Sequence, residues 1–350
     1  MALIENADTV QAVSLQGVDL TRAKLGGAVF EGVDFRGCRL EDASFANSTL
    51  VKCQFDDAKL CRVDLKGATA HQSSVASSDL RGAIGIEFNA IETSLDSCNF
   101  EGADLTDATF IKCSLRGARL TGARSFRTSL IEVLTDEIDL SGFAFVESVM
   151  LGADLTRAKL NDCRFEQSVL NKSRFSGQNL VGIDLRRSQF MEADLEGADL
   201  SKARMQQCGF KGAKLNKASL RQAQAANTLF IEAQADDADF SEADLFQSLW
   251  VDATLQRARF VGSRLEQAIL HRAKCMQATF QGANLRYADF SYADLRKARL
   301  DAAHWERTKF HGASRDEVQL PASVSILLED PDLLEAERWR PPASLSEGVS

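Results

Sequence analysis

The chain repeats every five residues from position 15 to position 310 without a change of phase. Each position divisible by five is called a centre, and Leu or Phe occupies 47 of the 60 centres. The position two residues earlier, called the small slot, holds Ala in 31 of 60 repeats. An amphipathic helix repeats at about 3.6 residues and an exposed strand at about 2. The period of five instead predicts a wound coil, in which short extended pieces alternate with corners.

Glycine and phenylalanine each keep one place in this repeat. Eighteen of the 22 glycines follow a centre by two residues, as Gly17, Gly102 and Gly182 do. Glycine accepts a positive φ without steric cost, so these positions predict the corners. Seventeen of the 21 phenylalanines stand at centres, which indicates that the aromatic residues form a core and not a binding platform.

Many repeats share one sequence motif. This motif is Ala-Asp-Leu or Ala-Asn-Leu, in triplets that end at Leu105, Leu155, Leu195, Leu245, Leu285 and Leu295. Over roughly residues 13–313 the chain resembles the pentapeptide-repeat proteins. The resemblance implies an all-β fold, a right-handed quadrilateral parallel β-helix with four repeats per coil and with centres and small slots pointing inward. The 60 centres would then make about 15 coils, and at ~4.8 Å per coil a rod about 70 Å long.

The sequence tests the four-sided arrangement independently, because one outer face should then recur every 20 residues. Directly after the centres at 30, 50, 70 and so on, 8 of 14 residues are large and aliphatic, and the other three sides hold fewer. These and their neighbours before the same centres predict an apolar stripe, the candidate partner-binding face: Val51, Ile91, Ile111, Ile131, Leu151, Met191, Leu229, Ile231, Leu249, Val251 and Ile269. Intrinsic β-propensity is the alternative explanation.

The repeat also divides the chain. Residues 1–12 are a short lead-in, 13–313 form the β-helix, and 314–350 form a C-terminal cap with a loose end. All four prolines follow residue 320, and Pro331 to Trp339 predicts a short helix with proline at its start. We expect this segment to cover the last coil around Trp305 and Phe310, because the open end of a solenoid needs a cap.

Two segments, 84–93 and 124–143, break the pattern while keeping its phase. Gly85, Ser125 and Thr135 occupy centres there, and large residues enter small slots. Each segment is either a projecting loop, which would be a binding candidate, or a coil that is locally repacked. The candidate loop residues are Ile84, Ile86, Phe88, Phe126, Val133 and Leu134.

Chemistry-bearing motifs are absent from the sequence. Six of the eight cysteines fill small slots, Cys275 is at a centre, and only Cys61 is expected to be exposed; no Cys-x-x-Cys occurs. Of the four histidines, only His304 and His311 lie close enough in the repeat to share a site, and metal sites need three or four ligands. The Asp residues before centres belong to the repeat. We therefore expect no enzyme activity, no cofactor and no metal.

Charge bears on the best-known activity of the family, protection of type II topoisomerases such as DNA gyrase by rods that resemble acidic DNA. The chain carries −9, of which residues 311–350 contribute −5, so the body carries −4. DNA carries one negative charge per ~1.7 Å of helix axis. This nearly neutral body makes the DNA mimic the weaker alternative, and we expect no direct nucleic-acid binding.

The preferred interpretation is a non-enzymatic scaffold or adaptor. A long apolar stripe on a soluble rod favours binding of a protein partner or of a second copy, which would make a dimer. Some long members of the family accompany bacterial secretion machines, including type VI systems, so the resemblance also implies such an accessory role. No stretch approaches the ~20 apolar residues of a membrane span, and Met1 to Ala12 lacks a signal-peptide pattern. We expect a cytoplasmic protein without membrane insertion.

Overall fold

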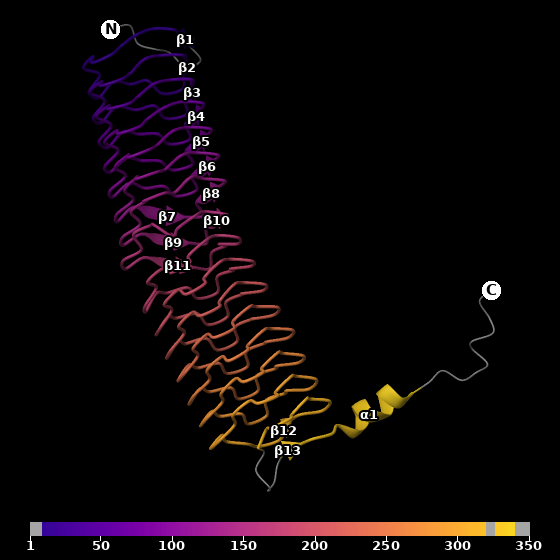
Figure 1. Cartoon of the computed structure of the whole chain (residues 1–350). Helices are drawn as coiled ribbons and strands as arrows, with labels where there is room; N and C mark the ends of the chain where they lie inside the picture. The colour runs from indigo at the N-terminus through magenta and orange to yellow at the C-terminus, as the bar shows by residue number, and fades with distance from the viewer. Residues whose placement is uncertain (1–8, 320–325, 340–350) are drawn as a thin grey trace, which may run out of the picture.

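The computed structural model describes residues 9–319 and 326–339 of the chain. Its body is a parallel β-solenoid of about 16 turns, stacked as a long rod with the first described coil at one end and β12 (Thr308–Lys309) at the other (Figure 1). At almost every level of the described rod the residue before a centre bridges to the residue 20 positions later, as Asp19 does to Arg39 and Ser44 to Asp64. Twenty residues per turn at a period of five give four sides, which confirms the quadrilateral β-helix with an inward row of centres.

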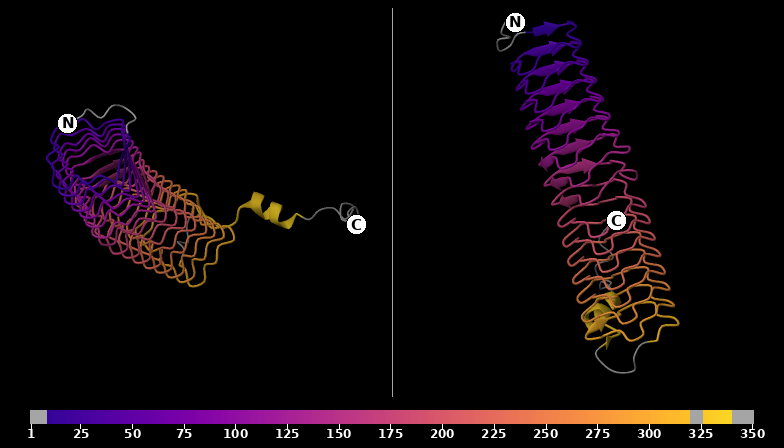
Figure 2. Two further views of the ribbon diagram at one scale, coloured as in Figure 1. Left: turned by 90° about the horizontal axis from the view of Figure 1, so that it is seen from above. Right: turned by 90° about the vertical axis from the view of Figure 1, so that its left-hand side faces the viewer.

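The four sides are named by their centres: side A holds Leu15 and Phe35, side B Leu20 and Leu40, side C Leu25 and Phe45, and side D Phe30 and Leu50. Side D carries the longest sheet, in the order β1-β2-β3-β4-β5-β6-β8-β10 (Figure 2). Its strands are β1 (Thr9–Gln11), β2 (Val29–Glu31), β3 (Thr49–Val51), β4 (Thr69–His71), β5 (Asn89–Ile91), β6 (Thr109–Ile111), β8 (Ser129–Ile131) and β10 (Val149–Leu151).

Side C carries a second, shorter sheet in the order β11-β9-β7. Its strands are β7 (Arg124–Phe126), β9 (Ala144–Val146) and β11 (Arg164–Glu166). Apart from a short strand pair at the C-terminal end and two levels that lack a bridge, the other described levels are held by single bridges between coils.

The corner that follows most centres is a tight turn. The N–H three residues after the centre donates to the carbonyl of the centre, as Cys38 does to Phe35 over 3.0 Å. The third residue of the turn has a positive φ, which is 69° at Gly17 and 59° at Asp42. That φ is required at the third position of a type II turn and is why glycine recurs there.

The aspartate of the Ala-Asp-Leu motif stabilises the same corner. In a typical repeat, Oδ1 of Asp104 accepts from the Thr106 N–H over 3.1 Å, and Asp194 does the same for the Glu196 N–H. A short polar side chain that bonds the backbone two residues later favours a turn. These carboxylates are therefore structural parts of the coil.

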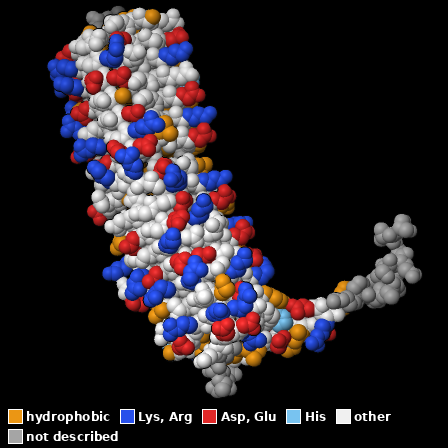
Figure 3. Space-filling model, in the orientation of Figure 1, with side chains coloured by type: hydrophobic (Ala, Val, Ile, Leu, Met, Phe, Trp, Pro, Cys, Tyr) orange, Lys and Arg blue, Asp and Glu red, His pale blue; other side chains and the backbone are white. Residues whose placement is uncertain are grey.

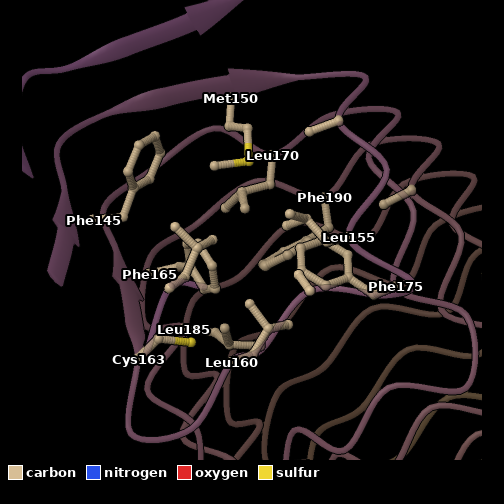
Figure 4. Packing of buried hydrophobic residues seen from close by; sticks show 14 of the residues in the cluster. Phe145, Met150, Leu155, Leu160, Cys163, Phe165, Leu170, Phe175, Leu185 and Phe190 are labelled. Atoms are coloured by element: carbon tan, nitrogen blue, oxygen red, sulfur yellow. The ribbon is translucent and has the colours of Figure 1, made fainter. Parts of the chain in front are cut away.

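Centres and small slots form one continuous core, since almost all of them are buried. Aromatic centres stack from coil to coil, with ring centroids 4.9 Å apart for Phe190 and Phe210 and 4.0 Å for Phe230 and Trp250. The indole N–H of Trp250 donates to the Ser248 hydroxyl over 2.8 Å. Figure 4 shows centres from successive coils pointing into the same interior.

The C-terminal segment closes the last coil on one side. Strand β13 (Ile326–Leu327) pairs in parallel with β12 (Thr308–Lys309), and Leu327 accepts from the Phe310 N–H. Phe310 is fully buried, and Trp305 packs against its ring. Helix α1 (Pro331–Arg338) follows, with Asp330 as N-cap and proline in its first turn. The predicted short helix is confirmed, and it projects sideways from the last coils with no buried residue (Figure 1). The segments 1–8, 320–325 and 340–350, including the expected loose tail, lie outside the described residues.

Candidate interaction surfaces

The predicted stripe lies along side D. In the N-terminal half its residues are the last residues of the strands and pair in register: Ile91 with Ile111, Ile111 with Ile131, and Ile131 with Leu151. Val51 pairs in register with two polar residues, Glu31 and His71, so it is not part of this aliphatic row. The structure thus brings four aliphatic side chains together, one coil apart on one outer face.

The backbone explains why these side chains point outward. Within each strand the centre is buried and the residues on both sides of it are partly exposed. Side chains alternate across a strand, so an inward centre forces both neighbours outward. In these coils the strand includes the residue after the centre whether or not that residue is β-branched, since Glu31 and His71 end strands as Ile111 does.

In the C-terminal half the stripe has a different local geometry. Leu229 bridges to Leu249 and Leu249 to Ile269, so these three residues form a second row on side D. Ile231 and Val251 lie in the following turns, not in strands. Met191 stands between the two rows and, with 41% of its surface exposed, is among the most accessible stripe residues, as is Leu229 at 40%.

The candidate loop residues belong to the coil. Ile84 bridges to Asp64 and Asp104, and Leu134 bridges to Ser114. Phe88 is 4% exposed, and its ring lies 6.1 Å from that of Phe110. Because Gly85 leaves space at the neighbouring centre, the large Phe88 side chain fills the interior from its small slot. Both segments are repacked coils, and the alternative of projecting loops is wrong.

Side C extends the apolar surface at Phe126 and Val146, the outward ends of strands β7 and β9, which pair in register. The guanidinium of Arg127 lies 4.4 Å from the centre of the Phe126 ring. Ile86 lies in a turn of the same side. Val133 is buried in a small slot, so only part of this set is available to a partner.

The charged surface is largely paired along the rod. Arg62 bonds Asp42 over 2.7 Å, and Arg272 bonds Asp252 in the same way one coil apart. In such pairs the hydrogen-bonded arginine holds the pKa of the aspartate below its ordinary value. Blue and red side chains alternate over the visible face, without a broad acidic surface (Figure 3). A DNA mimic would require the acidic charge to be unbalanced.

The cysteine and histidine side chains are dispersed along the rod. All eight cysteines are free, and Cys61 alone is not buried. Burial raises the pKa of the Cys98 thiol to about 12, so it stays protonated. Among residues 9–319 and 326–339 no three Cys, His, Asp or Glu side chains are grouped to hold a metal. His311 is buried and contacts α1, where its Nδ1 accepts from the Asp330 N–H over 3.1 Å.

Two polar residues that interrupt the bonding between coils could be recognised only partly from the sequence. Thr135 and Gln178 stand at a centre and in a small slot, and their side chains bond carbonyl groups of neighbouring coils. The signal for Gln178 was its size, since small slots otherwise hold smaller or apolar residues. Each residue lies beside a missing bridge, between Leu134 and Asp154 and between Lys159 and Asn179, within the described part of the rod.

The fold and these surfaces define a four-sided repeat solenoid that presents flat outer sides. The family model for pentapeptide repeats matches eight copies, at residues 14–50, 38–75, 89–124, 136–171, 168–207, 208–247, 251–286 and 288–321. The chain therefore belongs to the pentapeptide-repeat family. In the described segments, no helix has both the length and the apolar character needed to cross a membrane.

Comparison with solved structures returns other repeat proteins. Full-length QnrB1, a plasmid-mediated fluoroquinolone resistance protein, is 18% identical with a TM-score of 0.45, covering 52% of this chain and 93% of its own. HetL of the cyanobacterium Nostoc sp. strain PCC 7120, involved in heterocyst differentiation regulation, is 24% identical with a TM-score of 0.24, covering 84% and 89%. No curated protein sequence matches. These similarities are too low to carry a functional conclusion.

Proposed function

We propose that this protein is a non-enzymatic scaffold that binds a protein partner through the apolar stripe on side D. The observation that carries the proposal is the row of Ile91, Ile111, Ile131 and Leu151, which pair in register on a continuous sheet. Exposed contiguous apolar surface on a soluble protein is typical of interaction sites. The four side chains are partly exposed and could be covered together by one flat partner surface.

Two features of the rod support a binding role over catalysis. The described residues provide no metal-ligand group, and the buried thiols are held protonated by their surroundings. Pentapeptide-repeat solenoids generally serve as scaffolds, and the flat sides here match that use. The partner is either another protein or a second copy of this chain. Binding to a type II topoisomerase is the weaker alternative, because acidic groups are paired with arginine and lysine along the coils.

The test replaces Ile111, Ile131 and Leu151 by lysine. Multi-angle light scattering and a pull-down from the native host would compare this triple variant with the wild type. We expect a dimer to become a monomer, or a specific partner to be lost, while the melting temperature changes little because the substituted side chains point outward.

A matched control places lysine at Glu101, Thr121 and Ser141, which follow centres on side B at comparable levels of the rod. This control should keep the association. A wild type that is monomeric, with a set of captured partners that the triple variant does not alter, would contradict the proposal and leave β-propensity as the explanation of the stripe.

A further inference from the structure

Side B contains an opening between two successive coils. Bridges join the coils of this side from Asp19 to Lys159 and again from Asn179 onward, but none joins Lys159 to Asn179 among the described residues. The opening has a volume of about 600 Å³ and is lined by residues 160–164 of one coil and 179–184 of the next. This volume lies within the roughly 300–1,000 Å³ of ordinary ligand pockets.

Gln178 explains the opening. Its side-chain Nε2 donates to the carbonyl of Leu155 over 2.6 Å and to that of Ala158 over 3.0 Å. One coil earlier on this side the equivalent carbonyl, that of Ile138, accepts from the Lys159 backbone N–H over 2.9 Å. The Gln178 side-chain amide donates to the Ala158 carbonyl in place of the Asn179 N–H. Because the side chain adds length between the two backbones, this link keeps the two coils farther apart than a direct backbone hydrogen bond would.

Backbone groups on both walls of the opening lack the partners that they have elsewhere on side B. Leu140 donates to Lys159 over 2.9 Å and Leu180 to Asp199 over 2.7 Å. In the described structure no such bond joins the N–H groups of Leu160 and Asp162 to the carbonyls of Asn179 and Val181. One wall therefore offers donors and the other acceptors, which is the arrangement at the two edges of an interrupted parallel sheet.

The floor and the rim of the opening add apolar and charged groups. Leu160 and Ile183 are each 7% exposed, whereas most centres and small slots in the following coils are near zero. Leu160 and Cys163 point into the interior beside each other (Figure 4). On the rim, Val181 is 50% exposed. Asp162 and Arg164 line the opening and form no ion pair with any described residue, so both charges are available to a ligand.

We propose that this opening binds an extended peptide segment of a partner protein, which inserts as a strand parallel to the two coils. The backbone of the segment would satisfy the donors of Leu160 and Asp162 and the acceptors of Asn179 and Val181. One apolar side chain would cover Leu160 and Ile183, with a basic group facing Asp162 and an acidic group facing Arg164. Strand addition of this kind gains affinity from main-chain bonds and specificity from the side-chain positions.

The peptide site is separate from the proposed function, because side B is opposite side D on the four-sided coil. The two proposals can therefore fail independently. A peptide that binds the opening should bind equally well when Ile111, Ile131 and Leu151 are lysine, and a partner of the stripe should be insensitive to changes in the opening.

The test pans a phage-displayed library of random peptides against the full chain and measures affinities of the enriched peptides by fluorescence anisotropy. We expect enriched peptides with one apolar residue between a basic and an acidic residue. Affinity should fall at least about tenfold in Val181→Arg, which blocks the rim, and in Gln178→Ala, which restores the usual small residue and lets the coils close. Hydrogen exchange at the amides of residues 160–162 should slow when peptide is bound.

Val261→Arg is the matched control. It occupies the same slot of side B four coils later, where the Val261 carbonyl accepts from the Glu242 N–H and the coils are closed. This variant should bind the peptides as the wild type does, and melting temperatures would confirm that all variants fold. Enrichment of no peptide, or unchanged affinity in either Val181→Arg or Gln178→Ala, would overturn the proposal.

Discussion

The hydroxyl of Thr135 donates to the carbonyl oxygen of Asp154 over 2.7 Å, where the other coils of side A use a backbone N–H. In the preceding coil of that side, the Leu115 N–H donates to the Leu134 carbonyl over 2.8 Å. The bridge between Leu134 and Asp154 is missing, and Thr135 is 2% exposed. A buried side chain thus replaces a main-chain bond between coils.

Removing this hydroxyl should be costly. Thr135→Val keeps the shape of the side chain but leaves the Asp154 carbonyl without its donor, so we expect a loss of about 1–3 kcal/mol in the free energy of unfolding. Urea denaturation would measure it. Thr135→Ser, which keeps a hydroxyl, should lose less, and equal stability of Thr135→Val and the wild type would show that the bond contributes nothing.

Two buried alanines, one in a small slot and one at a centre, should respond in opposite directions to added volume. Ala198 is fully buried in a closed coil, so Ala198→Trp should overpack it and cost at least about 1–3 kcal/mol. Ala70 instead lines a small interior cavity with Val75 and Phe88. Ala70→Val should fill part of it and stabilise the fold by about 1 kcal/mol. Thermal melting of both variants checks the pair, and stabilisation by Ala198→Trp would contradict an inward small slot.

The joint between α1 and the last coils should depend on His311. Its ring is buried, lies 5.3 Å from the Tyr292 ring, accepts from the Asp330 N–H and contacts Glu337 over 3.3 Å. We expect His311→Ala to release α1 and to speed tryptic cleavage at Arg338 several-fold, with little change in the melting of the rod. His271→Ala, on the rod itself, is the control and should leave that cleavage rate unchanged.

Stability should fall in acid because hydrogen-bonded arginines lower the pKa values of corner aspartates. Arg36 lowers the pKa of Asp34 to about 2, and Arg81 lowers that of Asp79 to about 2. A depressed carboxyl pKa contributes stability above the ordinary value near 3.8, and this contribution is lost as pH falls through the folded value. Melting temperatures measured between about pH 5 and pH 2 should therefore decrease.

The double variant Asp34→Asn, Asp79→Asn isolates this effect. Each asparagine can still accept from the backbone N–H two residues later, but it no longer titrates. The variant should be less stable than the wild type at neutral pH and should lose less stability between about pH 4 and pH 2. An unchanged acid profile would assign the acid loss to other carboxylates.

Protection of DNA gyrase offers a direct test of the alternative function. Because the acidic side chains are balanced by neighbouring bases, we expect no rescue of DNA supercoiling from a fluoroquinolone at stoichiometric protein. Supercoiling assays with increasing protein would measure it. Potent protection would make the DNA mimic the main function and reduce the stripe to a feature of the fold.

Much of the fold was predictable because every repeat buries the same position and turns at the same position. Large apolar centres such as Leu105 must be buried and glycines such as Gly102 mark turns, so the period and the 20-residue recurrence were sufficient to place side D. The boundaries between strand and turn were not predictable. They depend on whether the N–H of the small slot bonds its own centre or a neighbouring hydroxyl, as the Cys53 N–H does with Ser73 over 3.0 Å.

The candidate site divides in the same way. The row from Ile91 to Leu151 follows from periodicity alone. The opening on side B depends on one side chain, Gln178, whose amide competes with a backbone N–H for the same carbonyl. A sequence pattern does not show which of these two hydrogen bonds is the more stable. For the irregular segment around Gly85, the sequence is equally compatible with a projecting loop and with a repacked coil. The burial of Phe88 in the structure distinguishes the two.

The relation between a five-residue repeat and a 20-residue turn has a consequence for how such a chain can change in length. Deleting one repeat, for example residues 176–180, would preserve every inward position but would rotate all later residues by one quarter turn relative to the first half. Aliphatic residues such as Leu229 would then leave the face of Ile111. Only gains or losses of 20 residues keep both rows on one face. Insertions or deletions of one, two or three repeats would rotate the later coils and so change which residues face a partner.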